Sequence, residues 1–111
     1  TGPDGRRAPY SNHAPRIDVT APGGNSRLSV SVNGRAYPGG ILSTVRDQSG
    51  QDAYAFMDGT SMAAPHVEAA AALLLAGQEP TLTPDQVRAR LRASAAPLGS
   101  RCDVSGGCAP A

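Results

Sequence analysis

The chain has 111 residues, which is enough for one small domain or for part of a larger one. Its formal net charge is only +1, which excludes the strongly basic character typical of nucleic-acid-binding proteins. Its longest uninterrupted apolar run, residues 69–76, is far shorter than the roughly 20 residues of a transmembrane helix, so we predict neither a nucleic-acid nor a membrane partner.

The first half of the chain has the pattern of short strands separated by turns. Alternating or short apolar runs predict strands at residues 16–20, 28–32, 35–37, 41–45 and 53–57. Asn33-Gly34 is a strong signal for a tight hairpin between the second and third of these segments. Residues 47–51 form the predicted turn between the last two.

The stretch over residues 61–76 has the composition of a helix without a polar face. After Ser61, its only polar side chains are His66 and Glu68. A helix that is apolar almost all round is typical of a central, buried element, so we predict that this one is buried. Gly77 is the predicted end of the helix.

A second helix is marked by its start signals. Thr83 is a predicted N-cap, Pro84 suits the first helical position, and Gln86 completes a capping box. Leu82 and Val87 have the spacing of a hydrophobic staple.

The faces of this second helix differ in polarity. One face is apolar and the other is basic: Val87, Leu91, Ala95 and Leu98 form the first, and Arg88, Arg90 and Arg92 the second. The arginines are interpreted as a solvated face rather than as a binding patch.

The only two cysteines, Cys102 and Cys108, are separated by a polar, glycine-rich loop. Such a loop can fold back on itself, so a local disulfide is favoured over two free thiols, and it favours an oxidising compartment. The predicted location is therefore secreted, either extracellular or periplasmic. A zinc site would need more ligands, and neither histidine lies nearby in the sequence.

Ser61 stands in the first turn of the predicted long helix, where backbone N–H groups lack partners within the helix and can hold a developing oxyanion. Gly59 leaves room for a peptide to approach the main chain, and Pro65 cannot donate to the Ser61 carbonyl. These features are those expected around a nucleophilic serine. The alternative from physics alone is an ordinary Thr/Ser cap on a helix.

Residues 59–67, GTSMAAPHV, closely resemble the serine motif of the subtilisin-like serine peptidases, the subtilases. Further segments resemble the same family in the right order and spacing: residues 10–12, 17–19, 21–23, 39–44 and 53–56. The resemblance covers nearly the whole chain. It implies that residues 1–111 are the C-terminal portion of a subtilase catalytic domain, truncated at both ends. The implied fold class is α/β, as a fragment of a mainly parallel three-layer subtilisin-like fold.

The resemblance implies that Ser61 is the nucleophile and that its backbone N–H is one oxyanion donor. Gly59 and Thr60 would border the substrate, and Met62 would lie beside the nucleophile. The chain departs from the family at Glu68 and Ala69, where subtilases usually have a small residue followed by glycine, and at Ala14, where they often have glycine. A buried, unpaired carboxylate is costly, so Glu68 needs a partner or a wet position.

The other two members of a serine triad have no counterpart in this sequence. His66 lies about 140° round the helix from Ser61, so it cannot accept the Ser61 proton, and we assign it a structural role. Asp4 and His13 precede Ser61 in the triad's order of residue types but lie in neither of the family's motifs for those residues. A serine without a base is an ordinary alcohol, so we predict that the isolated chain is inactive. A parallel sheet needs neighbouring strands to cover its edges, so we also predict that the isolated chain folds poorly.

The resemblance therefore implies a secreted serine endopeptidase that cleaves polypeptide substrates through an acyl-enzyme. Its base, its orienting Asp and the rest of the catalytic domain would lie upstream. Calcium often stabilises this family, but no loop here has a recognisable calcium-ligand spacing, so no cofactor is predicted for this chain. The alternative is a non-catalytic relative that acts as a binding or scaffold module. An unrelated small disulfide domain is disfavoured, because one short disulfide loop stabilises little and the core is thin.

Overall fold

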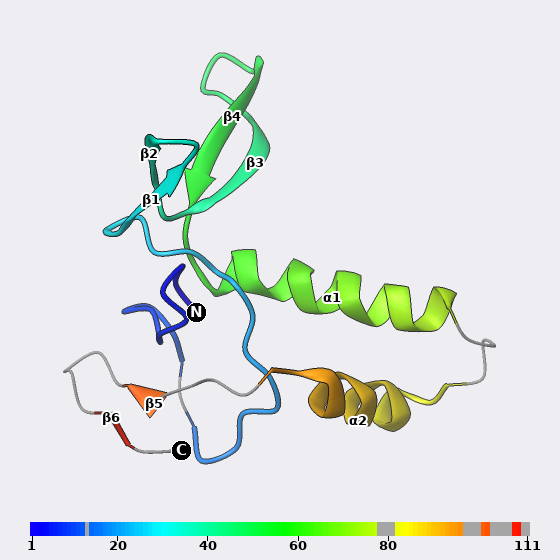
Figure 1. The fold of residues 1–111 in the computed structure, drawn as a ribbon. Coiled ribbons are helices and arrows are strands. Elements are labelled where there is room, and N and C mark those ends of the chain that lie inside the picture. The colour runs from blue at the N-terminus through cyan, green and yellow to red at the C-terminus, as the bar shows by residue number, and fades with distance from the viewer. Residues whose placement is uncertain (13, 78–81, 97–100, 103–107, 110–111) are drawn as a thin grey trace.

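The computed structural model describes residues 1–12, 14–77, 82–96, 101–102 and 108–109. These residues form three two-stranded sheets and two helices (Figure 1). In chain order the elements are β1 (Ser29–Val32), β2 (Arg35–Pro38), β3 (Ile41–Arg46), β4 (Asp52–Met57), α1 (Thr60–Ala76), α2 (Pro84–Ser94), β5 (Arg101–Cys102) and β6 (Cys108–Ala109).

Strands β1 and β2 form the predicted tight hairpin. Val32 pairs with Arg35, so Asn33 and Gly34 alone make the turn, with φ angles of 51° and 78°. Positive φ at both central residues is the requirement of a type I′ turn, which explains the Asn-Gly sequence. This part of the prediction is confirmed.

Strands β3 and β4 form a second antiparallel hairpin, in register from Ile41↔Met57 to Arg46↔Asp52. Its loop is organised by Asp47, whose carboxylate Oδ1 accepts from the backbone N–H groups of Ser49 and Gln51, both at 2.9 Å. Such local hydrogen bonds are the reason that Asp favours turns. The predicted strands and turn are confirmed with shifts of one residue.

The strand predicted at residues 16–20 is wrong for this structure. Those residues alternate in polarity but pair with no strand among the described residues, and a strand is defined by its hydrogen-bonded neighbour. All three sheets that the structure describes are antiparallel pairs. The mixture of helices and strands confirms α and β content, whereas the parallel layering stays a prediction.

Helix α1 forms where the sequence predicts it and ends at Gly77, whose N–H donates to the Leu73 carbonyl at 3.1 Å. The prediction that it is buried is wrong for the described chain, because none of its residues is buried and Leu73 is 74% exposed. Among the described elements, the helix packs mainly against α2. Its apolar surface is therefore open on most sides.

Helix α2 has the predicted capping box. Thr83 Oγ1 accepts from the Gln86 backbone N–H at 3.4 Å, and the Gln86 side chain accepts from the Thr83 N–H at 2.8 Å. Leu82 and Val87 both line the cleft between α1 and α2, and the staple contact between them stays a prediction. The helix ends at Ser94, and Leu98 lies outside the described residues.

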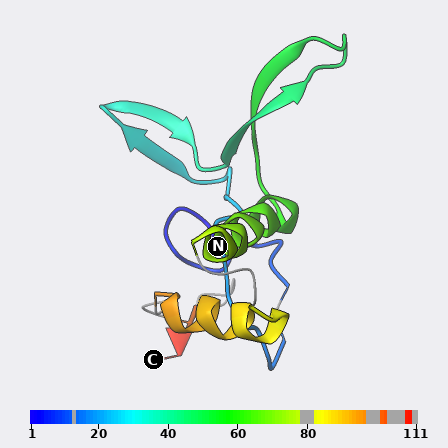
Figure 2. The same ribbon diagram turned by 90° about the vertical axis from the view of Figure 1, so that its right-hand side faces the viewer.

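The two helices lie side by side, and the two long hairpins diverge from one end of α1 (Figures 1 and 2). The radius of gyration is 16.3 Å, compared with about 13 Å for a compact domain of this length. Among the described residues, Ala8 is the only buried hydrophobic side chain. The arrangement thus positions the beginning of α1 between the hairpins and the N-terminal segment without a conventional core.

Candidate active site

Ser61 is the second residue of α1. The helix begins at Thr60 after Gly59, which is the N-cap and supplies no side chain to cap the helix. The side chains of Thr60 and Ser61 are exposed, and Met62 is half-buried. Within the described part of the chain, the Ser61 hydroxyl takes part in no hydrogen bond. The four residues predicted for the site therefore form one continuous turn that is open to solvent.

The first backbone N–H groups of this turn have no acceptor among the described residues. The Gly59 carbonyl accepts from Met62 N–H at 3.1 Å and from Ala63 N–H at 3.4 Å, so the amides of Thr60 and Ser61 precede the first bonds of the helix. Unpaired amides at a helix N-terminus, together with the helix dipole, favour an anion. Pro65 lies inside α1 and cannot donate to the Ser61 carbonyl, yet the helix continues through it.

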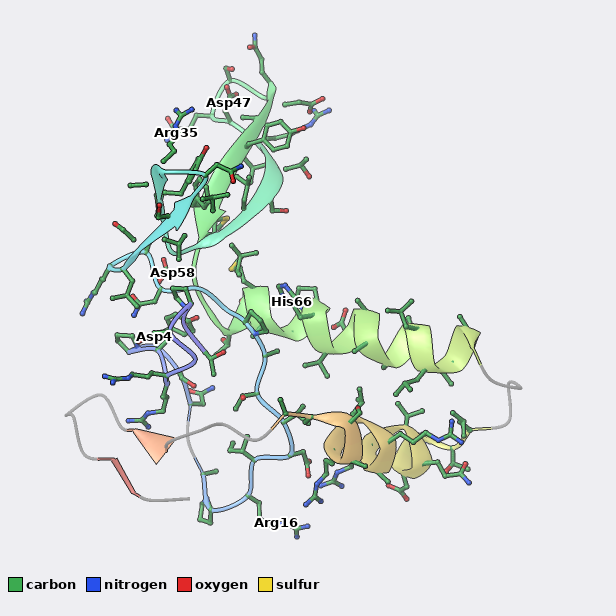
Figure 3. All side chains as sticks on the ribbon, in the orientation of Figure 1. Asp4, Arg16, Arg35, Asp47, Asp58 and His66 are labelled. Carbon is green, nitrogen blue, oxygen red and sulfur yellow. The ribbon has the colours of Figure 1, made fainter. Side chains whose placement is uncertain are left out.

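His66 is engaged by its own helix rather than by Ser61. Its Nδ1 lies 2.8 Å from the Met62 carbonyl oxygen, and since that oxygen can only accept, Nδ1 carries the proton. Figure 3 shows His66 on the side of α1 that faces away from α2. The hydrogen bond within the helix agrees with the structural role predicted from the helical angle.

A contact that sequence reasoning missed joins Tyr10 to the turn before α1. The Tyr10 hydroxyl donates to the Gly24 carbonyl at 2.5 Å, and the Gly59 N–H donates to the Gly23 carbonyl at 2.9 Å. Burial raises the pKa of Tyr10 above its usual value, and the negative charge of Asp58 raises it further, against an opposing hydrogen bond from the Gly59 backbone. The Gly23-Gly24 sequence indicates a backbone position without side chains, but it does not identify the residues that hydrogen-bond to it.

Asp58, immediately before Gly59, is held by the Ser26 hydroxyl, which donates to Asp58 Oδ1. Figure 3 shows Asp58 just ahead of α1, beside the N-terminal segment. It lines a small polar hollow whose other lining residues are Pro9, Tyr10, Asn25 and Arg27. The residues on the N-terminal side of the candidate site are thus tied down by both a backbone bond and a side-chain bond.

The other residues singled out in the sequence belong to separate segments of the chain. Asp4 is exposed and accepts from the Arg6 N–H at 3.1 Å, while His13 lies outside the described residues. The register of β5 and β6 places Cys102 opposite Cys108, and the disulfide itself stays a prediction. Nowhere in the described ranges do three His, Cys, Asp or Glu side chains gather as a metal site would require, and no helix there is long and apolar enough to cross a membrane.

Glu68, the main departure in the long helix, is exposed. Its carboxylate therefore has access to water, as a carboxylate without a partner requires. Asp18 is the other carboxylate of note, because it joins the segment before Gly23 to α2. A hydrogen bond from Arg88 Nη2 to Asp18 Oδ1 at 2.9 Å lowers the pKa of Asp18, and the charge of Arg92 acts in the same direction.

Known proteins share sequence similarity with this chain over most of its length, including the turn around Ser61. The sequence profile of the Subtilase family matches residues 1–107. The chain is 39% identical over 104 residues to an extracellular protease of Xanthomonas campestris pv. campestris, covering 94% of this chain and 16% of that protein. It is 41% identical over 90 residues to an extracellular basic protease of Dichelobacter nodosus, covering 78% of this chain and 13% of that protein.

A subtilisin of Bacillus pumilus is 41% identical over 95 residues, covering 86% of this chain and 27% of that protein. No solved structure gives a significant match. The chain thus spans about an eighth to a quarter of the length of these relatives. Because the family profile covers almost every residue, including the turn around Ser61, this chain belongs to the subtilase family.

Proposed function

We propose that this chain is the part of a secreted subtilisin-like serine endopeptidase that carries the nucleophile, Ser61. The observation that carries the proposal is the position of Ser61, which is exposed in the first turn of α1 within a chain of the subtilase family. Two of the relatives are named extracellular proteases, which supports secretion and a polypeptide substrate. The rest of a mainly parallel catalytic domain would surround these residues.

In this proposal Ser61 Oγ attacks the carbonyl carbon of the scissile peptide bond while a histidine outside this chain takes its proton. The tetrahedral intermediate puts negative charge on the former carbonyl oxygen, and the Ser61 backbone N–H stabilises it. The C–N bond then breaks, the histidine returns the proton to the leaving amine, and an acyl-enzyme remains. In the second half of the reaction, the histidine takes a proton from water while the water oxygen attacks the acyl carbon. The ester bond to Ser61 then breaks, and the histidine returns the proton to Ser61 Oγ.

The residues before and after the nucleophile have supporting roles. Gly59 and Thr60 border the peptide, and Met62 lies beside Ser61. A Cβ added at Gly59 would meet only Met62 Sδ and the Ser61 backbone nitrogen, both at 3.8 Å. Packing in the described chain thus leaves space over Gly59, which supports its assignment as a substrate-facing position.

The test uses the full-length protein that carries this sequence and a fluorophosphonate probe, which forms a stable bond only with an activated serine. We expect the wild-type protein to be labelled and the Ser61→Ala variant to remain unlabelled, because in this proposal Ser61 is the serine that the base outside this chain activates. Ser43→Ala is the matched control, since Ser43 is also exposed but lies on β3, and it is expected to label like the wild type.

Equal labelling of wild type and Ser61→Ala would assign the nucleophile to another residue. Absence of labelling in a folded wild-type protein would overturn the enzyme assignment and leave the non-catalytic scaffold as the alternative. The isolated chain is expected to remain unlabelled, because its Ser61 has no base among the described residues.

A further inference from the structure

Three segments that are distant in sequence meet immediately before the candidate nucleophile. The half-buried Tyr10 side chain reaches Gly24, where its hydroxyl donates to the backbone carbonyl at 2.5 Å. The neighbouring Gly23 carbonyl accepts the Gly59 N–H at 2.9 Å. The two carbonyls of the Gly23-Gly24 pair are therefore fixed by different partners, and one of these partners is the N-cap residue of α1.

The junction has little spare space. A Cβ placed on Gly23 would lie 2.6 Å from the Gly59 carbonyl oxygen, 2.6 Å from the Tyr10 hydroxyl oxygen and 3.4 Å from the Ala63 Cβ. Tyr10, Gly59 and α1 thus converge on one backbone position. Removal of one contact would give the Gly23-Gly24 segment freedom that it lacks in this structure.

The orientation of Ser61 depends on this junction because α1 has no side-chain N-cap. Gly59 begins the helix, and its carbonyl accepts the first two bonds of the turn that contains Ser61. Outside the helix, the ties recorded for this end are the Gly59–Gly23 bond and the Ser26–Asp58 bond. A shift of Gly23 is therefore transmitted to Gly59 and then to the nucleophile.

We propose that Tyr10 is a positioning residue for Ser61, acting through the hydrogen bond from its hydroxyl to Gly24 and the adjoining Gly23–Gly59 bond. The inference rests on the proposed function, since it concerns the same nucleophile. Tyr10 does not exchange a proton with substrate in this role. It restrains the turn so that Ser61 Oγ and the Ser61 N–H keep the geometry that the acylation step needs.

The experiment compares wild type, Tyr10→Phe and Tyr54→Phe in the full-length protein. Phe keeps the aromatic ring and removes only the hydroxyl. Tyr54 is the matched control, because it is 77% exposed and its hydroxyl has no hydrogen bond within the described residues. Active sites are titrated with the fluorophosphonate, and kcat and KM are then measured on a peptide amide, for which acylation limits the rate.

We expect Tyr10→Phe to lower kcat per titrated site about tenfold with KM within about twofold, a smaller loss than the roughly 100-fold that a 1 Å misplacement can cause. Tyr54→Phe is expected to match the wild type. The kcat per titrated site is the decisive quantity, because partial unfolding would lower the number of sites and leave their individual turnover unchanged.

A Tyr10→Phe protein with wild-type kcat per site would overturn the positioning role, whether or not fewer sites are titrated. An equal loss in Tyr54→Phe would also overturn it, since a general effect of removing tyrosine hydroxyls would then explain the result. If the folded wild-type protein does not react with the probe, the proposed function fails and the inference fails with it. Failure of the inference alone is distinguished by normal labelling of both the wild type and Tyr10→Phe.

Discussion

At the scale of single residues, Gly23 carries the strictest steric requirement near the candidate site. Because Gly23 has no side chain, the Tyr10 hydroxyl and the Gly59 carbonyl can both lie close to its backbone. Gly59 itself has no such packing requirement in the described chain, since its nearest contacts would be at 3.8 Å. We therefore propose that the two glycines serve different purposes, Gly23 for the fold and Gly59 for access of the substrate.

We predict that Gly23→Ala destabilises the full-length protein by about 1–3 kcal/mol, because the added methyl group must displace the Gly59 carbonyl or the Tyr10 hydroxyl. Gly77→Ala is the control, since its Cβ would meet only the Leu73 carbonyl oxygen at 3.5 Å. Urea unfolding in a Ser61→Ala background, which prevents self-digestion, measures both. Equal stability of the two variants would show that the junction relaxes freely.

At the scale of elements, Asp18 joins helix α2 to a segment that lies 70 residues before Arg88 in the chain. Arg88 Nη2 lies 2.7 Å from Asp18 Oδ2, and Arg92 Nη1 lies 3.5 Å from Asp18 Oδ1. Two of the three arginines interpreted as a solvated face therefore also make an ion-pair network. The side chains remain about half exposed, so solvent screens the interaction.

This network predicts a pH dependence. The pKa of Asp18 is lower in the folded protein than in the unfolded chain, so its contribution to stability is present above the unfolded pKa and is lost as the pH falls through the folded pKa. We expect the wild type to lose stability below about pH 4 and Asp18→Asn to lose less over the same interval.

Urea midpoints at pH 7 and pH 3, again in the Ser61→Ala background, measure this difference. Asp52→Asn is the control, because Asp52 is 93% exposed and its contact with Arg46 is 3.6 Å long. An acid response of Asp18→Asn identical to that of the wild type would contradict the assignment.

At the scale of the whole molecule, the described residues fully bury no large side chain and leave several large hydrophobic side chains exposed. Leu73 of α1 is 74% exposed and Tyr54 of β4 is 77% exposed, while Ala8 is the only buried hydrophobic residue of the described ranges. Burial of apolar area is the main stabilising contribution to folding, at about 25 cal/mol per Å². These faces resemble the inner faces of a larger domain.

We therefore predict that the isolated 111-residue chain does not unfold cooperatively. Its thermal transition, followed by near-UV and far-UV circular dichroism, should be broad and non-coincident, and it should bind the dye ANS. The full-length Ser61→Ala protein is the reference and should show a sharp transition without dye binding. A sigmoidal, coincident transition in the isolated chain would contradict this prediction.

The local features were within reach of the sequence. Asn33-Gly34 specifies the β1–β2 turn, Thr83 and Gln86 specify the start of α2, and Gly77 marks the end of α1. Each depends on hydrogen bonds or backbone angles within a few residues, so the information lies in the segment itself. The serine motif likewise located the candidate nucleophile and the family.

The long-range contacts were not within reach. The Tyr10–Gly24 and Gly59–Gly23 bonds of the junction join positions 14 and 36 residues apart, and the Asp18–Arg88 pair joins positions 70 apart. Such contacts depend on the path of the whole chain, and the local sequence of one segment does not predict which distant segment it contacts. The predicted strand at residues 16–20 and the predicted burial of α1 failed for the same reason, since both need neighbours that composition does not specify.

The sequence by itself therefore determined where both helices begin, where α1 ends and where the two hairpins turn, and that Ser61 occupies a helix N-terminus, because these properties are encoded over a few neighbouring residues. Only the tertiary structure decided what holds the turn before Ser61 in place and which apolar faces remain open. Hydrophobic patterning requires that a face be covered, but the covering surface is chosen by packing between distant segments.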